Sequence, residues 1–143
     1  PTYKMKVGGL REIYYNRDKL NVNVEVTKDS YVYIFVKDED NKVYQYYPNK
    51  YQKDNFVKAN EILKFPDTRI FDMILDSPKG KDSLVNIIVL AGKEPINFLG
   101  FKYSDEYGLS IGEYRDFIVQ VVEIDKSKLI KYSSVYKITG GKN

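Results

Sequence analysis

The stretch "SYVYIFVKDEDNKVYQYYPN", residues 30–49, decides the fold that this sequence predicts. Residues 31–36 are apolar at every position, which is typical of a strand buried on both faces. The polar residues 38–41 suit a turn, and residues 43–47 suit a second strand. That strand should end at Pro48, because proline cannot donate a hydrogen bond to a sheet. We therefore predict a central β-hairpin.

The register of this hairpin decides which way its tyrosines point. With an even loop, Tyr44 and Tyr46 share a face with Phe35 and the other odd-numbered aromatic residues of the first strand. With a three-residue loop and a bulge at Asn41, they join Val36 and the other even-numbered residues. We favour the second register, since a type I turn followed by a bulge suits "DEDNK".

Alternating patterns predict more strands on either side of the hairpin. Residues 20–26, "LNVNVEV", alternate apolar and polar with a two-residue period, as half-buried antiparallel strands do. Further strands are predicted at residues 3–7, 61–65, 69–75, 84–91 and 132–138. Residues 49–60 read as a long polar loop, residues 76–82 as a turn, and Gly140–Asn143 as a tail.

A change of period near the C-terminus predicts a helix. Ser110 and Glu113 fit a capping box, in which each side chain bonds the other's backbone amide. Apolar residues then recur at three-four spacing: Tyr114, Phe117, Ile118, Val121 and Val122. The β-branched content of residues 117–122 would also suit a strand, but the cap and the period together favour the helix.

Seven to nine short strands separated by turn signals indicate a mainly β fold. We predict an antiparallel β-sandwich of immunoglobulin-like build with one C-terminal helix. Residues 1–143 are expected to form a single domain, a module of a larger protein.

The composition narrows the function. The chain has no histidine and no cysteine, which removes Ser-His-Asp and Cys-His catalysis and the usual zinc sites. Its net charge is +3, but the lysines are interspersed with acids, so we expect no nucleic-acid partner. No apolar run is long enough for a membrane span. We expect no cofactor and no enzymatic activity.

The acidic turn is the best candidate for a metal site. Asp38 and Asp40 supply alternating carboxylates and Asn41 an amide oxygen, which are ligands that Ca²⁺ prefers. The glycine and the terminal glutamate of an EF-hand loop are absent. We therefore favour an ordinary turn, with Asp38 accepting a local amide and Asn41 in a left-handed conformation.

The 14 tyrosines allow two interpretations. Tyrosine fills cores well, because it supplies a large apolar area and can send its hydroxyl to the edge. Alternatively, Tyr46, Tyr47 and Tyr51 are candidates for an exposed surface that binds a glycan or peptidoglycan. The absence of tryptophan favours core packing.

The order of motifs resembles a bacterial family, the domain of unknown function numbered 4384. The motifs are "LNVNVEV", "SYVYIFV", "DEDNKV", "YYPN", "KFP", "SPKG" and "IIVLAGKEPI", spanning about residues 10–98. Asn41 stands where the family turn usually carries glycine, and asparagine also tolerates the left-handed conformation. Gly92 stands where serine or threonine is frequent.

This resemblance implies a setting and no chemistry. Members look like accessory modules of bacterial cell-envelope or secreted proteins, often beside repeat, protease-like or kinase domains, with no known catalytic residues. We therefore expect an extracytoplasmic, lipoprotein-associated interaction or structural module with a protein partner. Glycan or peptidoglycan binding is the alternative.

Overall fold

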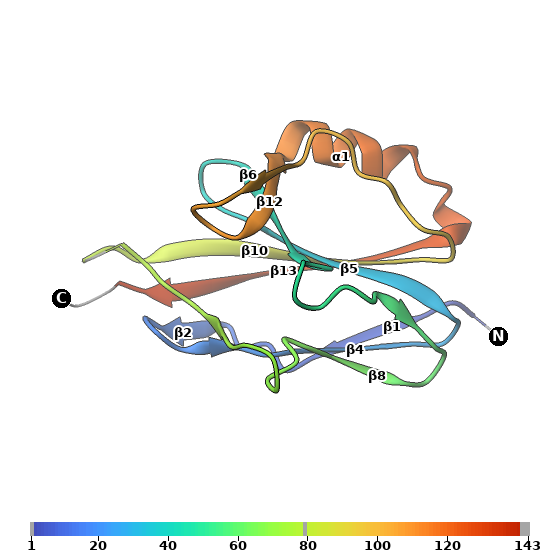
Figure 1. The fold of residues 1–143 in the computed structure, drawn as a ribbon, viewed down its shortest axis with the longest axis horizontal. Helices are drawn as coiled ribbons and strands as arrows, with labels where there is room; N and C mark the ends of the chain where they lie inside the picture. Colours follow the sequence, from blue (N-terminus) through green and yellow to red (C-terminus); the bar gives the residue numbers. More distant parts are fainter. Residues whose placement is uncertain (1, 79, 141–143) are drawn as a thin grey trace.

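The computed structural model describes residues 2–78 and 80–140 (Figure 1). It contains an eight-stranded sheet, a three-stranded sheet, a two-stranded sheet and one α-helix. The eight-stranded sheet has the order β11-β12-β6-β5-β10-β13-β2, and β7 pairs with β5 beside this path. Its strands are β2 (Ile13–Tyr15), β5 (Ser30–Lys37), β6 (Lys42–Tyr47), β7 (Phe56–Val57), β10 (Ser83–Gly92), β11 (Lys102–Ser104), β12 (Leu109–Glu113) and β13 (Leu129–Thr139).

The smaller sheets and the helices complete the fold. The three-stranded sheet has the order β1-β4-β8, and β3 pairs with β9. These strands are β1 (Met5–Gly8), β3 (Lys19–Leu20), β4 (Val22–Val26), β8 (Ile62–Phe65) and β9 (Met73–Ile74). Helix α1 (Tyr114–Glu123) is followed by a short 3-10 helix, η1 (Lys126–Lys128).

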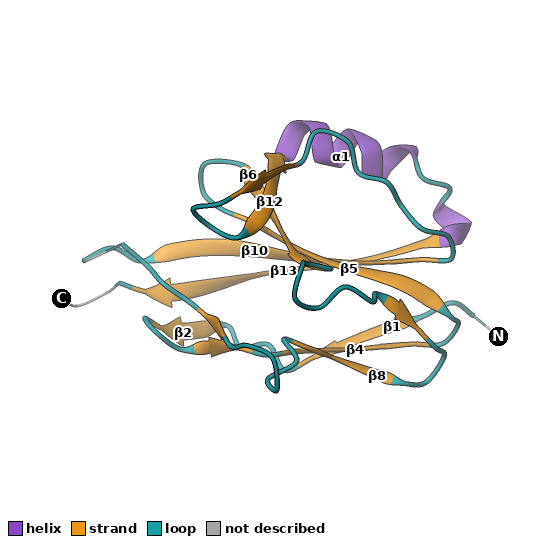
Figure 2. Cartoon of the chain, in the orientation of Figure 1, coloured by secondary structure: helices purple, strands orange, loops and turns teal. Residues whose placement is uncertain are grey.

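The central part of the large sheet is covered on both faces. Figures 1 and 2 show β1, β4 and β8 on one side of β5, β10 and β13, and α1 on the other. Val24 of β4, Ile34 of β5 and Ile87 of β10 belong to the core between the two sheets. Phe35 and Phe117 belong to a second core beneath the helix. The predicted mainly β fold, with sheets facing each other and one C-terminal helix, is confirmed.

The central hairpin has the register that we favoured. Val36 pairs with Tyr44. Asn41 has a φ of 59°, and its N–H donates to the carbonyl of Asp38 at 3.2 Å, as a type I turn with a left-handed fourth residue requires. A second irregularity then places Tyr47 opposite Ile34, so Tyr46 is an extra residue in β6.

The predicted central strands are confirmed. In β5, Val32, Ile34 and Val36 belong to the core between the sheets, whereas Tyr33 and Phe35 belong to the core under α1. The strand is therefore apolar on both faces because both faces are buried. β10 lies next to β5 and divides its residues between the same two cores.

The helix is confirmed, but its predicted capping box is wrong. Ser110 lies in β12 and pairs with Gln45, and Glu113 is the N-cap residue without a side-chain capping bond. The amide of Tyr114 instead donates to the carbonyl of Asn41 at 2.9 Å, so the hairpin turn satisfies one free N–H of the helix. Val122 was predicted to face the core, yet it is 68% exposed.

Other differences concern short strands. Thirteen strands are present in the described residues, more than the seven to nine predicted. β2, β7, β11 and β12 were not predicted, and only Met73–Ile74 of residues 69–75 forms a strand. β2 also pairs parallel to β13, so the large sheet is not purely antiparallel. Strands of two or three residues carry too little alternation to be recognised.

Two predicted segments fall partly outside the described residues. The turn at residues 76–82 is present, with the N–H of Lys81 donating to the carbonyl of Pro78 at 3.0 Å, although residue 79 is not described. Of the predicted tail, only Gly140 is described, and its N–H donates to Asp82 Oδ1 at 2.6 Å. Residues 141–143 lie outside the described range.

Candidate functional site

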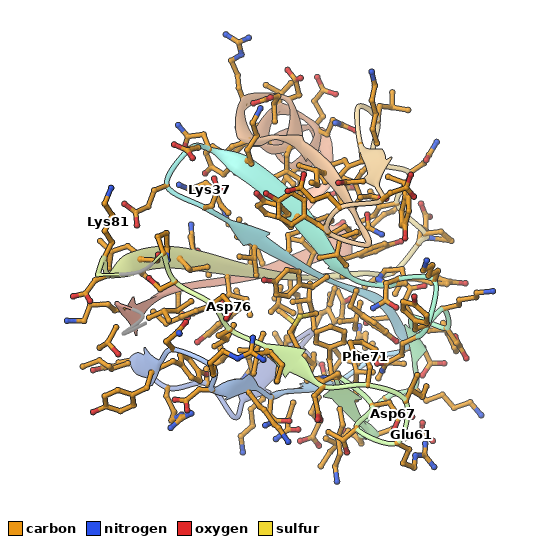
Figure 3. The ribbon with its side chains drawn as sticks, turned by 60° about the vertical axis from the view of Figure 1, so that its left-hand side comes forward. Lys37, Glu61, Asp67, Phe71, Asp76 and Lys81 are labelled. Atoms are coloured by element: carbon orange, nitrogen blue, oxygen red, sulfur yellow. The ribbon has the colours of Figure 1, made fainter. Side chains whose placement is uncertain are left out.

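The acidic turn uses its first carboxylate for its own structure. Asp38 Oδ1 accepts the backbone N–H groups of Asp40 at 2.9 Å and Lys42 at 3.0 Å, and Oδ2 accepts the Tyr44 hydroxyl at 3.0 Å. Asn41 Oδ1 accepts a hydrogen bond from Lys37 Nζ, a residue labelled in Figure 3. Within the described ranges, no three Asp or Glu residues gather in an arrangement that could hold a metal ion.

Burial, followed by the bond to Asp38, raises the pKa of the Tyr44 hydroxyl above its ordinary value. The phenol is protonated at neutral pH and donates a hydrogen bond to the Asp38 carboxylate. The Asp38 carboxylate thus links β6 to the turn that precedes it, and its three hydrogen bonds all stabilise the hairpin.

The three tyrosines predicted as a glycan-binding surface do not lie together on the surface. Tyr47 is fully buried, with its ring centroid 5.6 Å from that of Phe65, so its predicted exposure is wrong. Tyr46 is half-buried against the same ring, and burial raises its pKa to about 12. The extra residue in β6 explains this, because it lets two consecutive tyrosines pack against the same core.

Tyr51 is the exposed member of this set, with 57% of its surface accessible. Its ring lies 6.1 Å from that of Phe71, which Figure 3 labels. Tyr51 also adjoins a groove that the sequence did not predict.

The groove has a volume of about 360 Å³ and is open to solvent. Gln45, Ser110 and Tyr103 occur in register across β6, β12 and β11, and all three line it. The loop that follows β6 contributes Asn49, Lys50 and Lys53. The groove therefore forms where the β11–β12 hairpin joins the edge of β6.

Asn49 gives the loop its shape. Its Oδ1 accepts the backbone N–H groups of Tyr51 at 2.8 Å and Gln52 at 2.9 Å, and its Nδ2 donates to the carbonyl of Tyr46 at 2.8 Å. Gln45 Nε2 donates to the carbonyl of Pro48 at 3.0 Å. An asparagine side chain that bonds amides two and three residues on is a common turn device. The loop is thus held against β6, and Lys50 lies at its exposed turn.

Lys50 is placed between two tyrosines. Its Nζ lies 5.0 Å from the ring centroid of Tyr51 and 5.2 Å from that of Tyr103, distances typical of cation–π contacts. Polar interaction with the side chain of Tyr103, and then with that of Tyr51, raises the pKa of the Lys50 ammonium. Lys50 therefore keeps its charge at every physiological pH.

The groove is locally positive. Two lysines, Lys50 and Lys53, line it, and no Asp or Glu of residues 2–78 and 80–140 does. Among the described residues, neither lysine takes part in an ion pair. Both charges are therefore available to a ligand.

A second exposed surface lies at the other edge of the large sheet. In Figure 1, the ends of β10 and β13 extend past α1, and the helix does not cover them. Ile13, Leu84 and Val135 are each about half exposed there, at 48%, 55% and 59%. Cross-strand pairing puts them on one face, around Lys137. Nothing in the structure indicates what would cover this face.

The family model described as Domain of unknown function (DUF4384) matches residues 13–95. The chain belongs to this family. The match covers the strands from β2 to β10, with the hairpin and the loop that carries Lys50, and it ends before the β11–β12 hairpin that completes the groove. Among curated proteins, none matches the chain. Within the described residues, no helix is long and apolar enough to cross a membrane.

Proposed function

We propose that this DUF4384 domain is a non-catalytic interaction module of a bacterial cell-envelope or secreted protein, and that a partner protein binds at the groove. The observation that carries the proposal is the exposed Lys50 ammonium, held between Tyr51 and Tyr103 beside an open groove. Exposed aromatic and cationic side chains that are already positioned are typical of binding surfaces.

Several features support a binding role over a catalytic one. The sequence has no histidine or cysteine to act as a general base or nucleophile near neutral pH. The groove offers lysines, amides and hydroxyls, without the paired carboxylates of a glycosidase. The raised pKa values of Tyr44 and Tyr46 have burial as their first cause, and burial is a property of packing. The extracytoplasmic setting rests on the family resemblance.

A glycan- or peptidoglycan-binding module is the second candidate. It is favoured by the exposed rings of Tyr51 and Tyr103, which are 57% and 48% accessible. Aromatic rings of this kind can stack on the apolar faces of sugars. The displacement of Tyr47 into the core weakens this candidate, because it removes one of the three predicted rings.

Capture of partner proteins from an envelope extract tests the proposal. We would compare the immobilised wild-type domain with a Lys50→Glu/Lys53→Glu variant and with a Lys131→Glu control. Lys131 is an exposed residue of β13, three strands from β6, or about 14 Å at the usual strand spacing.

A protein that the wild type and the control retain, that the groove variant loses, and that binds again when purified would support the proposal. Identical protein sets from all three would contradict it. A groove variant that releases bound peptidoglycan fragments and no protein would favour the glycan candidate.

A further inference from the structure

The groove also indicates which chemical group it recognises. Its two lysines lie among neutral side chains, and Asp54, which follows Lys53 in the sequence, does not line it. A cation without an acidic neighbour attracts carboxylates, and it does so most strongly when its position is already fixed. Lys50 is fixed in this way by its contacts with two rings.

The same contacts distinguish a peptide from a sugar. A sugar that stacks on tyrosine needs a free ring face. The Lys50 ammonium occupies one face of Tyr51 and one face of Tyr103. Those two ring faces are therefore not free to stack on a sugar. The neighbouring side chains of Asn49, Ser110 and Gln45 suit hydrogen bonds to a peptide main chain.

We propose that the groove binds an extended acidic segment of the partner protein, with Asp or Glu carboxylates contacting Lys50 and Lys53. This inference rests on the proposed function and names the chemistry of its partner. In an extended chain, alternate side chains point the same way, so acids at every second position face the lysines together. The polar side chains between the two lysines and β12 then meet the main chain of the segment.

Fluorescence anisotropy with labelled peptides tests the inference. The probes are a peptide that alternates glutamate and serine, its glutamine counterpart, and an oligogalacturonate as a carboxylate-bearing sugar. We expect the glutamate peptide to bind at least about tenfold more tightly than the glutamine peptide. Lys50→Gln and Lys53→Gln should each weaken that binding by about threefold to fivefold. Raising the salt concentration from about 0.05 M to about 0.5 M should weaken the binding of the glutamate peptide to the wild-type domain.

Lys131→Gln is the matched control, because it removes the same charge from β13 and leaves the groove intact. Equal binding of the two peptides would overturn the inference, as would equal weakening by the control. Tighter binding of the oligogalacturonate would overturn it in favour of a sugar acid. If a captured partner needs the groove but the glutamate peptide does not bind, the proposed function stands and the carboxylate inference fails.

Discussion

Val36 lies directly opposite Tyr44 across the β5–β6 hairpin. This pairing places Tyr44 where its hydroxyl reaches Asp38 Oδ2 at 3.0 Å, and Asp38 in turn accepts two amides of the turn. The turn therefore helps to hold β6 in register, and the Tyr44 hydroxyl of β6 supplies a hydrogen bond to the Asp38 carboxylate of the turn. β6 then continues into the loop that carries Lys50, so the register also positions the groove.

Asn41→Ala should destabilise the domain by about 1 kcal/mol. Asn41 has a φ of 59°, and alanine pays a steric cost in the left-handed region that asparagine largely avoids. Chemical denaturation monitored by circular dichroism would measure the loss.

Asn41→Gly separates this backbone effect from the lost side chain. Both variants remove the hydrogen bond from Lys37 Nζ, but glycine adopts the left-handed region freely. The glycine variant should stay within about 0.5 kcal/mol of the wild type. If both variants lost the same stability, the backbone explanation would be wrong.

The hairpin and its turn could be predicted from the sequence because their signals are local. Residues 31–36 are apolar at every position, and "DEDNK" fits one turn type well. The capping box at Ser110 and Glu113 is an equally local signal and is wrong, since pairing of Ser110 with Gln45 extends β12 up to the helix. Tertiary pairing overrides a local preference there.

Glu113→Asp should stabilise helix α1. Glu113 is the N-cap residue and makes no side-chain capping bond. The shorter carboxylate of aspartate can accept a free amide of the first helical turn, a contribution of about 0.5–1 kcal/mol. Thermal unfolding would show a higher Tm.

Glu113→Gln is the matched control for this helix cap. It weakens the exposed ion pair with Lys42 and adds no cap, so its Tm should stay level or fall slightly. An aspartate variant no more stable than the glutamine variant would show that the helix start does not need a side-chain cap.

Tyr136→Phe should leave the domain as stable or make it more stable, by up to about 1 kcal/mol. The Tyr136 hydroxyl is buried without a hydrogen-bond partner in the described part of the chain, and an unsatisfied buried hydroxyl is costly. Tyr14→Phe is the comparison, because the Tyr14 hydroxyl accepts the N–H of Arg11 at 3.0 Å. The loss of this hydrogen bond should lower the free energy of unfolding by about 1 kcal/mol. A Tyr136→Phe variant less stable than Tyr14→Phe would contradict this account.

The domain should lose stability as the pH rises above 10. Burial raises the pKa of Tyr46 from 10.0 to about 12, so between these values the unfolded chain releases a proton that the folded chain retains. The protonated Tyr46 contributes on the order of 2 kcal/mol to the free energy of unfolding. This contribution is complete below pH 10 and is lost as the pH approaches 12. Denaturation at several pH values would measure it. Burial also raises the pKa of Tyr44, Tyr47 and Tyr136, so Tyr46→Phe should lower the slope by the share of one tyrosine. An unchanged slope would disprove the assignment.

The groove could not be predicted because its parts lie far apart in the sequence. Lys50 belongs to a polar loop, and Tyr103 to a three-residue strand with no clear alternation. Only the pairing of β12 with β6 brings them together. The burial of Tyr47 could not be predicted for a related reason, since the bulge in β6 that buries it has no sequence signal of its own.

Two-dimensional NMR of the labelled domain, titrated with the glutamate–serine peptide, tests the central claim most directly. We predict chemical-shift changes at residues 48–53 and 102–110, centred on Lys50 and Tyr103, and their disappearance in Lys50→Gln but not in Lys131→Gln. Changes centred instead on the uncovered face at Ile13, Leu84 and Val135, or spread evenly over exposed lysines, would contradict the claim that this groove is the binding site.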